Sequence, residues 1–497
     1  MVSVPDGPRR GIHRLRAVTA GLSLSCVLAC GESPPPRHNV LLVTFDTTRA
    51  DHLEPYGGPA GLTPALVDLA RRGTVFETVR ASAAVTPVAH ASLFTGLNPY
   101  RHGLRTLHGN RLFHLPEKAT TLAERYEALG YATAAFISAF PCSRRFGLAQ
   151  GFATFDEPGD LDRARVGAAG NVSTGLAQRG SLETTNAALA WLTDRPRDRP
   201  FFLWIHYFDP HDPLLRPPPV FTSPFVDGVA EHADIDRLLS SDPASFGKTY
   251  GNRPEVMRPW LKGIYSAEIH FADGQLARIL EELRGTGLLG KTIVAVTADH
   301  GEGLGDHGWW GHGILYEEQL RVPLILAGPG VPGAMRVADA VRQIDVAPTL
   351  MDLSAKTRFR DPVEGISLVP LVRARASGGR PDPASLPGPA YADSVAIMRY
   401  GAFFSRDAVE EKNDQLYAWI EGDMKWIRHR IHPENGELYD LATDPHEAHN
   451  LFGERPGEAA RLDAHLSREK PMTEAISLTL PEDPEVLQRL RSLGYVE

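Results

Sequence analysis

Short apolar runs recur along the chain, and each is followed by a polar turn and a stretch with helical spacing of its apolar residues. The runs are rich in β-branched and aromatic residues, which is typical of buried parallel strands. The predicted strands are Asn39–Phe45, Ala132–Ile137, Phe201–Tyr207, Thr292–Thr297 and Val322–Ala327. The predicted helices are Thr63–Arg72, Thr121–Leu129, Leu182–Leu192 and Tyr265–Leu283.

Strands that alternate with helices predict an α/β fold with a doubly wound, mainly parallel sheet flanked by helices. Ligands of such sheets bind beyond the carboxyl ends of the strands. Asp46, Asp209 and Asp299 each stand just after a predicted strand. We therefore expect these three carboxylates at one edge of the sheet.

Two segments depart from this pattern. Leu214–Pro259 is rich in proline and has little periodicity, which predicts a long surface excursion, either a roof over a site or an insertion without function. Residues 373–389 are predicted to form a linker between a main domain at 38–372 and a smaller C-terminal α+β subdomain at 390–497. We expect this subdomain to contain an antiparallel sheet and a terminal helix. The expected strands are Ala390–Phe404, Asp423–Arg430 and Glu437–Leu441, and the helix is Pro481–Leu493.

Residues 1–29 are predicted to form an export signal, because four arginines precede an apolar run from Ala17 to Ala29. That run is shorter than the roughly 20 residues that a membrane-spanning helix needs. Val27-Leu28-Ala29-Cys30 resembles a bacterial lipobox, whose cysteine is lipidated after cleavage. We therefore expect a protein of the cell envelope or periplasm that is anchored to a bacterial membrane at Cys30 through a proline-rich linker at 30–37. A soluble periplasmic protein is the alternative.

The composition is that of a globular protein, since 42% of the residues are hydrophobic and 23% are charged. The formal net charge of -9 disfavours nucleic-acid binding, which requires a basic surface. If export removes Cys26 and a lipid occupies Cys30, Cys142 is the only thiol left and no intramolecular disulfide can form. The core must then supply the stability.

Two strand ends carry residues of the type that binds divalent cations. Asp46 follows the first strand, although a single carboxylate there is also a common strand-end cap. Asp299-His300-Gly301-Glu302 follows the strand Thr292–Thr297, and an adjacent carboxylate and imidazole at a turn can converge on one metal ion. Together the two strand ends predict a metal site.

Thr86-Pro87 begins a predicted helix that ends near Gly96. Threonine is favoured at the N-cap and proline at the first helical position, so a cap is the simplest interpretation. A hydroxyl at a helix N-terminus also lies in the positive field of the helix dipole, which suits an alkoxide or a bound oxyanion. Metal coordination would activate this hydroxyl as a nucleophile.

In this order the motifs resemble those of the sulfatases, a family within the alkaline phosphatase superfamily, over nearly the whole mature chain. Asn39–Gly57 is similar to the family's first metal-binding strand, Pro87–Gly103 to its nucleophile helix and Thr297–Gly305 to its second metal segment. Further similar segments are Tyr316–Glu318, Leu320–Pro323, Ile344–Thr349, Asp361–Leu371 and Glu437–Leu451.

The resemblance implies an alkaline phosphatase-like fold and a metal-dependent hydrolase of sulfuric or phosphoric esters. The metal ligands that it implies are Asp46, Thr86, Asp299 and His300. An imidazole ligand favours Zn²⁺ or Mn²⁺, while Ca²⁺ and Mg²⁺ stay open. Asp209, His211 and His307 offer a second metal site, but their spacing does not match the family and that site is left unassigned.

The nucleophile position departs from the family pattern. Well-characterised sulfatases carry Cys or Ser in a Cys-x-Pro-x-Arg pattern and convert it to formylglycine. The matching residues here are Thr86-Pro87-Val88-Ala89-His90, and threonine is not a substrate of that oxidation. Threonine at this position is instead similar to superfamily members that cleave or transfer phosphate esters, such as nucleotide phosphodiesterases. We therefore predict Thr86 itself as the nucleophile.

The chain also lacks two charged features of the family. The acidic residue that often follows the first ligand is Thr47 here, and the lysine-tryptophan-histidine segment expected after the second strand is missing. His211 and His312 are candidate replacements that would stabilise substrate oxygens or protonate the leaving group. His90 is a third candidate. A hydrogen-bonded structural histidine is the alternative for each.

In the predicted reaction, the Thr86 oxygen attacks phosphorus or sulfur, His211 or His312 assists the leaving alcohol, and water or another acceptor resolves the adduct. The predicted substrates are small-molecule, lipid-headgroup or glycan esters, and the oligomeric state is left open. The alternatives are a true sulfatase of sulfated glycans or aryl sulfates and a lipid-anchored binding protein without turnover. Clustered carboxylates are costly without a metal ion, which argues against the binding protein.

Overall fold

The structure is a computed structural model of the chain. It describes residues 37–105, 114–158, 178–211, 217–229, 231–241, 253–357, 362–394 and 414–468. The predicted export signal, all of the predicted linker at 30–37 except residue 37, and the predicted terminal helix lie outside the described residues. Within the described ranges, no helix is both long enough and apolar enough to cross a bilayer.

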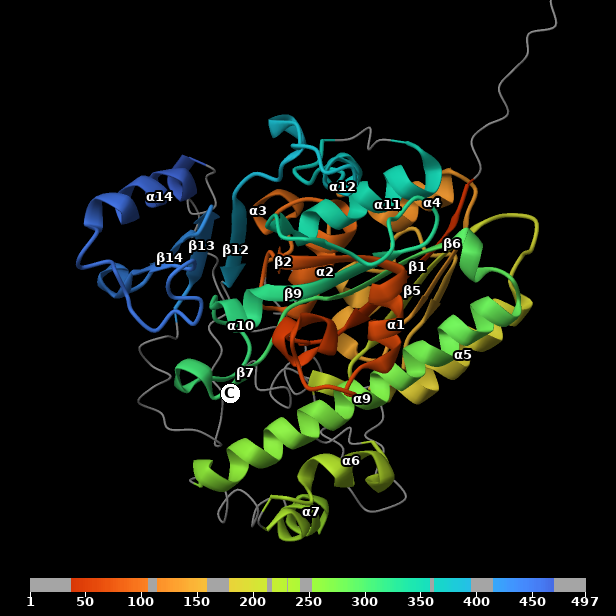
Figure 1. Cartoon of the computed structure of the whole chain (residues 1–497), viewed down its shortest axis with the longest axis horizontal. Coiled ribbons are helices and arrows are strands. Elements are labelled where there is room, and N and C mark those ends of the chain that lie inside the picture. The colour runs from red at the N-terminus through yellow and green to blue at the C-terminus, as the bar shows by residue number, and fades with distance from the viewer. Residues whose placement is uncertain are drawn as a thin grey trace, which may run out of the picture. The chain divides into compact units, whose positions relative to one another are not determined.

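The centre of the main sheet is built from the predicted apolar runs. β1 (Asn39–Phe45) lies between β5 (Phe201–Tyr207) and β6 (Thr292–Ala298) and pairs with both in parallel, and β3 (Ala132–Phe136) pairs in parallel with the far side of β5. Every residue of these strands is buried, which explains why they are apolar along their whole length. The predicted doubly wound, mainly parallel sheet is confirmed (Figure 1).

One strand runs the other way. β9 (Arg321–Ala327) pairs antiparallel with β6 on one side and with β2 (Gly73–Arg80) on the other. The expectation of a parallel strand at Val322–Ala327 is therefore wrong, and β2 was not predicted at all. Parallel neighbours need a long crossover connection, whereas residues 299–320 contain only short elements at the carboxyl edge, so the chain turns back directly. The shorter strands of this sheet are β4 (Thr154–Asp156), β10 (Met335–Val337) and β11 (Val341–Arg342).

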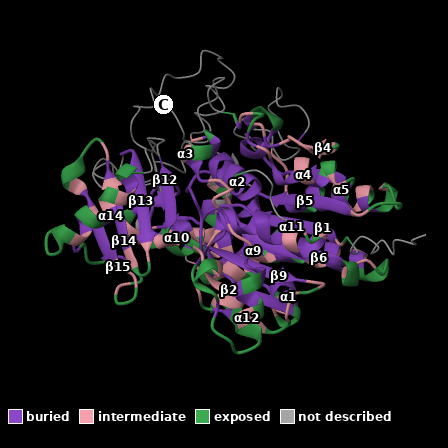
Figure 2. Cartoon of the chain, turned by 90° about the horizontal axis from the view of Figure 1, so that it is seen from above, coloured by how far each residue is buried: buried purple, intermediate pink, exposed green. Residues whose placement is uncertain are grey.

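Helices flank the main sheet (Figure 1), whose strands β1, β5 and β6 are coloured as buried in Figure 2. Side chains of β1 alternate between two layers of these helices. Val40 and Leu42 belong to one apolar core, and their neighbours Leu41 and Val43 belong to the other, because successive side chains of a strand point to opposite faces. The first core includes residues of α2 (Thr86–Thr95), α4 (Leu122–Ala128), α11 (Val346–Ala355) and α12 (Val369–Ala376). The second includes residues of α1 (Pro64–Arg72), α5 (Ser181–Asp194) and α9 (Pro254–Gly285).

The segment predicted as an irregular excursion is partly helical. It contains α6 (Pro219–Val226), α7 (His232–Ser241) and the start of α9. Proline is tolerated in the first turn of a helix, where its missing N–H has no partner to lose, and both α6 and α9 begin at a proline. Val226, Ile235 and Trp260 join these three helices in a small apolar cluster.

The C-terminal part holds the expected antiparallel sheet. Its four strands, in spatial order, are β12 (Ala390–Ser394), β13 (Leu416–Glu421), β14 (Met424–His429) and β15 (Glu437–Asp440). One face packs on α14 (Pro456–Arg468), while side chains of the other face, such as Ala392 and Ala418, belong to the first core of the main sheet. The linker expected from residue 373 begins inside α12, because that helix continues to Ala376.

Candidate active site

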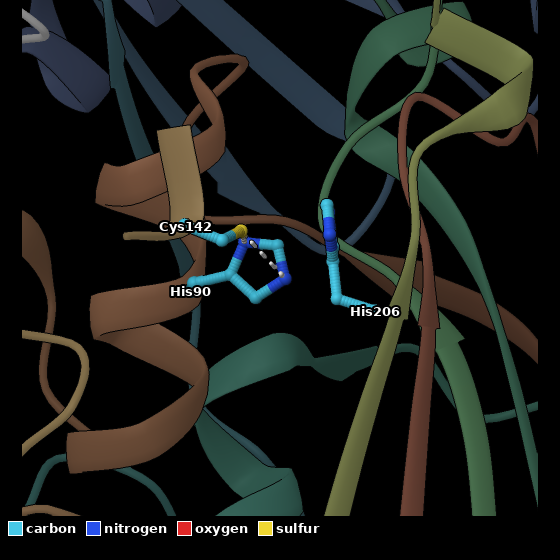
Figure 3. Close-up of side chains that lie close together, drawn as sticks. All are labelled: His90, Cys142 and His206. Carbon is cyan, nitrogen blue, oxygen red and sulfur yellow. Dashed lines mark hydrogen bonds between the residues drawn. The ribbon is translucent and has the colours of Figure 1, made fainter. Parts of the chain in front are cut away.

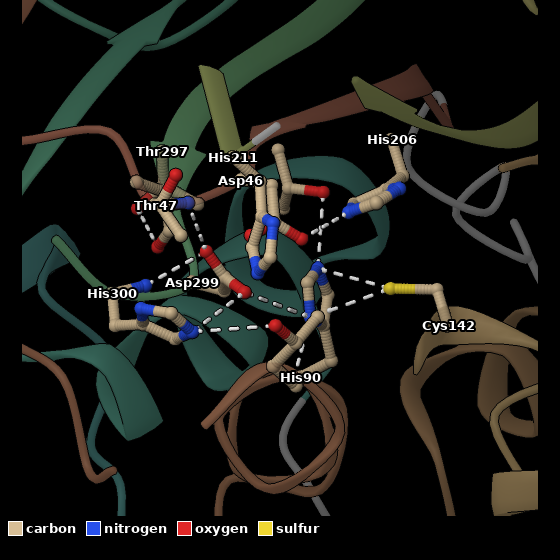
Figure 4. Close-up of polar contacts among 12 residues, drawn as sticks. Asp46, Thr47, His90, Cys142, His206, His211, Thr297, Asp299 and His300 are labelled. Carbon is tan, nitrogen blue, oxygen red and sulfur yellow. Dashed lines mark hydrogen bonds and ion pairs between the residues drawn. The ribbon is translucent and has the colours of Figure 1, made fainter. Parts of the chain in front are cut away.

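Asp46 and Asp299 lie side by side at the carboxyl edge of the main sheet. β1 and β6 are parallel neighbours with Phe45 opposite Ala298, so the residue that follows each strand emerges at the same place. Both aspartates are fully buried, and ligand-type atoms of Asp46, Asp299 and His300 all lie within 4.8 Å of one another. Figures 3 and 4 show the side chains that gather in this region.

In each of the two carboxylates, one oxygen accepts hydrogen bonds and the other does not. Asp46 Oδ2 accepts a hydrogen bond from His206 Nε2 at 2.8 Å. Asp299 Oδ1 accepts from the backbone N–H groups of Thr47 at 3.0 Å and His300 at 2.8 Å. Among the described residues, Asp46 Oδ1, Asp299 Oδ2 and Thr47 Oγ1 are buried without a hydrogen-bond partner. A buried polar atom left in this way costs about 1–3 kcal/mol, so the two carboxylate oxygens, on residues whose ligand atoms lie within 4.8 Å of each other, indicate a bound cation.

The pKa values of the two aspartates and of His300 also favour a bound cation. Burial and the neighbouring Asp299 raise the pKa of Asp46 well above its usual range, and burial raises the pKa of Asp299 to about 6. Burial lowers the pKa of His300 to about 4, so this imidazole is neutral near pH 7. Its Nδ1 donates to the Gly301 carbonyl at 2.9 Å, which leaves the lone pair of Nε2 for a ligand. A divalent cation would favour the ionised carboxylates and bind this lone pair.

Distances around His300 Nε2 suit a small ion. This atom lies 3.4 Å from Asp299 Oδ2 and 3.3 Å from Thr86 Oγ1. Neighbouring ligands of a tetrahedral ion with bonds of about 2.0–2.1 Å are about 3.3–3.4 Å apart. The residues present therefore fit a divalent metal ion held by Asp46, Asp299, His300 and Thr86.

Thr86 is the first helical residue of α2, not its cap. Val85 occupies the N-cap position, no side chain caps the helix, and Pro87 is the second helical residue. The expectation that Thr86 caps the helix is therefore wrong by one position. Because the backbone does not use the Thr86 hydroxyl, this group is free to face His300 at the positive end of the helix.

His90 lies one turn beyond Thr86, with both ring nitrogens engaged. Nδ1 donates to the Thr86 carbonyl at 2.8 Å, and Nε2 lies 3.1 Å from Thr44 Oγ1. Trp204 Nε1 donates to the same Thr44 oxygen at 3.0 Å, so the threonine hydroxyl donates to His90. This arrangement ties the first turn of α2 to β1 and favours the structural alternative for His90.

His211 and His312 form a pair beside His300. Their Nε2 atoms lie 3.1 Å apart. His312 Nδ1 donates to the Ala84 carbonyl at 2.9 Å, so His312 Nε2 is the acceptor and His211 Nε2 carries the proton. The His312 ring centre lies 4.5 Å from that of His300. Burial and the neighbouring imidazoles lower the pKa of both histidines of the pair well below the usual value.

The residues considered for a second metal ion are not assembled. The carboxylate of Asp209 accepts hydrogen bonds from the Ser181 backbone and hydroxyl at 2.8–3.1 Å, which satisfies the start of α5. His307 lies 3.0 Å from Glu318 Oε1 and 3.0 Å from the His446 carbonyl, so it links the main domain to the C-terminal part. Neither residue joins His211 in the described structure.

Two residues of this region carry roles that their sequence positions did not suggest. His206 belongs to β5, where the register places it opposite Thr44 of β1, and the only sequence signal was a polar residue inside an apolar strand. Thr47 has a φ of 48°, a left-handed conformation that is rare for a β-branched residue. Such strain concentrates at functional sites. Tyr265 holds this turn by donating to the Thr47 carbonyl at 2.7 Å.

The chain is similar to known proteins in sequence and in fold. The sulfatase family model matches residues 38–355. An arylsulfatase of Clostridium perfringens is 27% identical over 389 residues, which cover 69% of this chain and 80% of that protein. The structure of BT4656 in complex with its substrate D-glucosamine-2-N,6-O-disulfate has a TM-score of 0.68 at 21% identity, covering 87% of this chain and 97% of that one. The phosphonate monoester hydrolase of Agrobacterium radiobacter has a TM-score of 0.65 at 20% identity and 87% and 95% coverage. Both structures share the fold.

Proposed function

This chain belongs to the sulfatase family of ester hydrolases, and on that basis we propose that it is a metal-dependent hydrolase of sulfate or phosphate esters with Thr86 as its nucleophile. The observation that carries the proposal is the Thr86 hydroxyl, 3.3 Å from His300 Nε2 at the start of a buried helix. The two unpaired oxygens of Asp46 and Asp299 belong to the same group of residues.

A divalent ion bound by Asp46, Asp299 and His300 would lower the pKa of the Thr86 hydroxyl and offset negative charge on the substrate. The imidazole ligand favours Zn²⁺ or Mn²⁺ over Ca²⁺ or Mg²⁺. Formylglycine chemistry is not part of the proposal, because threonine stands at the nucleophile position.

The side chains of the site have the following roles in the proposed reaction. The Thr86 hydroxyl loses its proton to solvent, its Oγ1 forms a bond to sulfur or phosphorus, and the bond from that atom to the ester oxygen breaks. His211 Nε2–H stays hydrogen bonded to His312 Nε2, which orients the His211 ring so that Nδ1 is the nitrogen left for the substrate. An anionic substrate would raise the pKa of His211, so this imidazole takes up a proton at Nδ1 and gives that proton to the leaving alcohol. Water then cleaves the Thr86 adduct and restores the hydroxyl.

The relatives support a tetrahedral sulfate or phosphonate group as the reacting part. One is an arylsulfatase, one binds a disulfated glucosamine and one is a phosphonate monoester hydrolase. The alcohol part that we propose belongs to a small molecule, a lipid headgroup or a glycan. Retained clustered carboxylates favour turnover over simple binding.

Export to the cell envelope and a lipid anchor at Cys30 are further parts of the proposal. They rest on the basic and apolar segments of residues 1–29 and on the proline-rich residues that follow. Expression of the full chain in a bacterium and separation of membranes from soluble proteins tests them. We expect the wild-type chain in the membrane fraction and the Cys30→Ser variant in the soluble fraction. Identical fractionation of both would contradict the anchor.

Replacement of Thr86 tests the nucleophile. Activity is measured on p-nitrophenyl sulfate, p-nitrophenyl phosphate, its diester and a phosphonate monoester. We expect Thr86→Ala to lower kcat on the preferred ester by about 10³-fold or more, whereas Thr86→Ser keeps a hydroxyl and a large part of the activity. Mass spectrometry of the Thr86 peptide after a rapid acid quench should show added sulfate or phosphate. Undiminished turnover by Thr86→Ala would remove this residue from the mechanism.

A further inference from the structure

His206 contacts a metal-ligand residue but is itself outside the group of ligands. Its ring accepts a hydrogen bond at Nδ1 from the Ser138 backbone N–H at 3.4 Å, and the Ser138 hydroxyl donates to the His206 carbonyl at 2.7 Å. With Nδ1 as the acceptor, the proton resides on Nε2, which donates to Asp46 Oδ2 at 2.8 Å. The ring is fully buried, so Ser138 and Asp46 fix its orientation and its tautomer.

His206 also lies near His90 and Cys142, and the three offer ligand-type atoms within 4.8 Å of one another (Figure 3). Their geometry does not suit a metal ion. Cys142 Sγ lies 3.7 Å from Nδ1 and 4.0 Å from Nε2 of His90, so the sulfur sits beside the ring and not along the lone pair of either nitrogen. Both nitrogens of His90 already have hydrogen-bond partners. We conclude that this trio is a packing contact and that the polar function of His206 is directed at Asp46.

Hydrogen bonds engage one oxygen of each of the two carboxylates proposed to bind the metal ion. His206 occupies Oδ2 of Asp46, and two backbone N–H groups occupy Oδ1 of Asp299. Each carboxylate therefore has one oxygen without a hydrogen-bond partner, and this oxygen is the better placed to bind a metal ion. In Figure 4, His206 reaches Asp46 from one side, while His300 lies beside Asp299 on the other. With the Nε2 atom of His300 and the Thr86 hydroxyl, the donor set amounts to four atoms.

We propose that His206 is a positioning residue that holds Asp46 as a one-oxygen ligand and thereby makes the site selective for a small four-coordinate ion such as Zn²⁺ over Ca²⁺. The inference rests on the metal dependence proposed above. Ca²⁺ takes six to eight oxygen ligands and commonly binds carboxylates through both oxygens. Zn²⁺ is satisfied by four ligands that include imidazole, and residues that orient its ligands contribute strongly to affinity.

Two variants of His206 separate its hydrogen bond from its packing. His206→Leu removes the donor to Asp46, whereas His206→Gln places an amide N–H close to the position of Nε2. The full chain is stripped of metal and titrated with Zn²⁺ against a competing chelator, and with Ca²⁺ by calorimetry. We expect His206→Leu to lose about 10–100-fold in Zn²⁺ affinity and to gain in Ca²⁺ affinity, while His206→Gln stays close to the wild type. An unchanged preference for Zn²⁺ in His206→Leu, or an equal loss in both variants, would overturn the proposal.

The wild-type protein provides a second readout that needs no variant. Co²⁺ substituted into the stripped protein should give the intense visible absorption of a four-coordinate ion, and the weak absorption of a six-coordinate ion would overturn the proposal. Circular dichroism and thermal unfolding check that each variant is folded. If His206→Leu does not fold, the Co²⁺ spectrum of the wild-type protein alone tests the proposal. Failure of the wild type to bind any divalent ion would overturn the metal dependence itself. Metal binding without the expected spectrum or selectivity removes only the role of His206.

Discussion

His211 Nε2 lies 3.1 Å from His312 Nε2, and the proton between them belongs to His211 because His312 uses its own N–H on the Ala84 carbonyl. His211 is partly exposed whereas His312 and Thr86 are buried. The pair therefore joins a buried histidine beside His300 to a partly exposed one. The sequence left open which of the two histidines donates a proton to the substrate, and His211 is favoured because both ring nitrogens of His312 are engaged.

This relationship predicts that the two histidines act as a unit. We expect His211→Ala and His312→Ala each to lower kcat/KM by about 10²–10⁴-fold, the usual range for a general acid or base. The double variant should lose little more than the worse single variant, because His312 acts through His211. Losses that multiply in the double variant would mean that the two side chains contact the substrate independently. His211→Asn, which keeps an N–H group, serves as the control for lost hydrogen bonding.

The strands around the site could be predicted because they are buried on both faces. β1 and β5 match their predicted ranges, since an unbroken apolar run has no other stable place than the centre of the sheet. The direction of β9 could not be predicted in this way, because it depends on the connection from β6 and not on the composition of the strand. β2 was missed for a related reason, since polar and charged residues interrupt its sequence, GTVFETVR.

The carboxylates of the site could be predicted from their places after parallel strands, but their hydrogen bonds could not. Nothing in the sequence tells which oxygen of Asp46 or Asp299 is engaged. That depends on His206, a lone histidine in an apolar run that composition alone assigns to the core, and on the left-handed turn at Thr47. Hydrogen bonds between distant segments are set by tertiary structure, which local pattern does not report.

Thr47 stands where many family members carry a second acidic residue, and restoring that residue should change the metal preference. We expect Thr47→Asp to raise Ca²⁺ affinity by about tenfold or more, because Ca²⁺ affinity grows with the number of charged oxygen ligands. Asp tolerates the left-handed conformation at this position better than threonine does. Thr47→Asn has the same shape without the charge and is the matched control. Calorimetric titration of the stripped proteins measures the effect, and equal Ca²⁺ affinities in the two variants would contradict it.

Metal removal should destabilise the protein more at pH 8 than at pH 5. Burial raises the pKa of Asp299 to about 6 in the metal-free protein, above its unfolded value, so its favourable contribution is fully present below the unfolded pKa and is lost as pH rises through about 6. At pH 8 the stripped site therefore holds the buried, ionised carboxylate of Asp299 without a cation beside it. We expect the difference in Tm between loaded and stripped protein to grow with pH.

Asp299→Asn is the control for this prediction, because its side chain does not titrate and is a poor metal ligand. Its Tm should respond little to metal addition at either pH. An equal difference in Tm between loaded and stripped wild-type protein at pH 5 and pH 8 would show that the Asp299 carboxylate does not carry the effect.

A last prediction concerns His429 in β14. Burial alone would lower the pKa of His429, but Asp414 and Glu437 outweigh burial and raise this pKa to about 9. His429 Nε2 lies 2.9 Å from Glu437 Oε1. The charged imidazole therefore stabilises the C-terminal sheet fully below its unfolded pKa of about 6.5, and this contribution is lost as pH rises through about 9. The loss is at most about 1.4 kcal/mol per pH unit in that window.

His429→Gln keeps an N–H group but does not titrate, so we expect its Tm to approach that of the wild type between pH 6.5 and pH 9.5. Parallel Tm profiles of the two proteins would show that His429 carries no extra charge in the folded state.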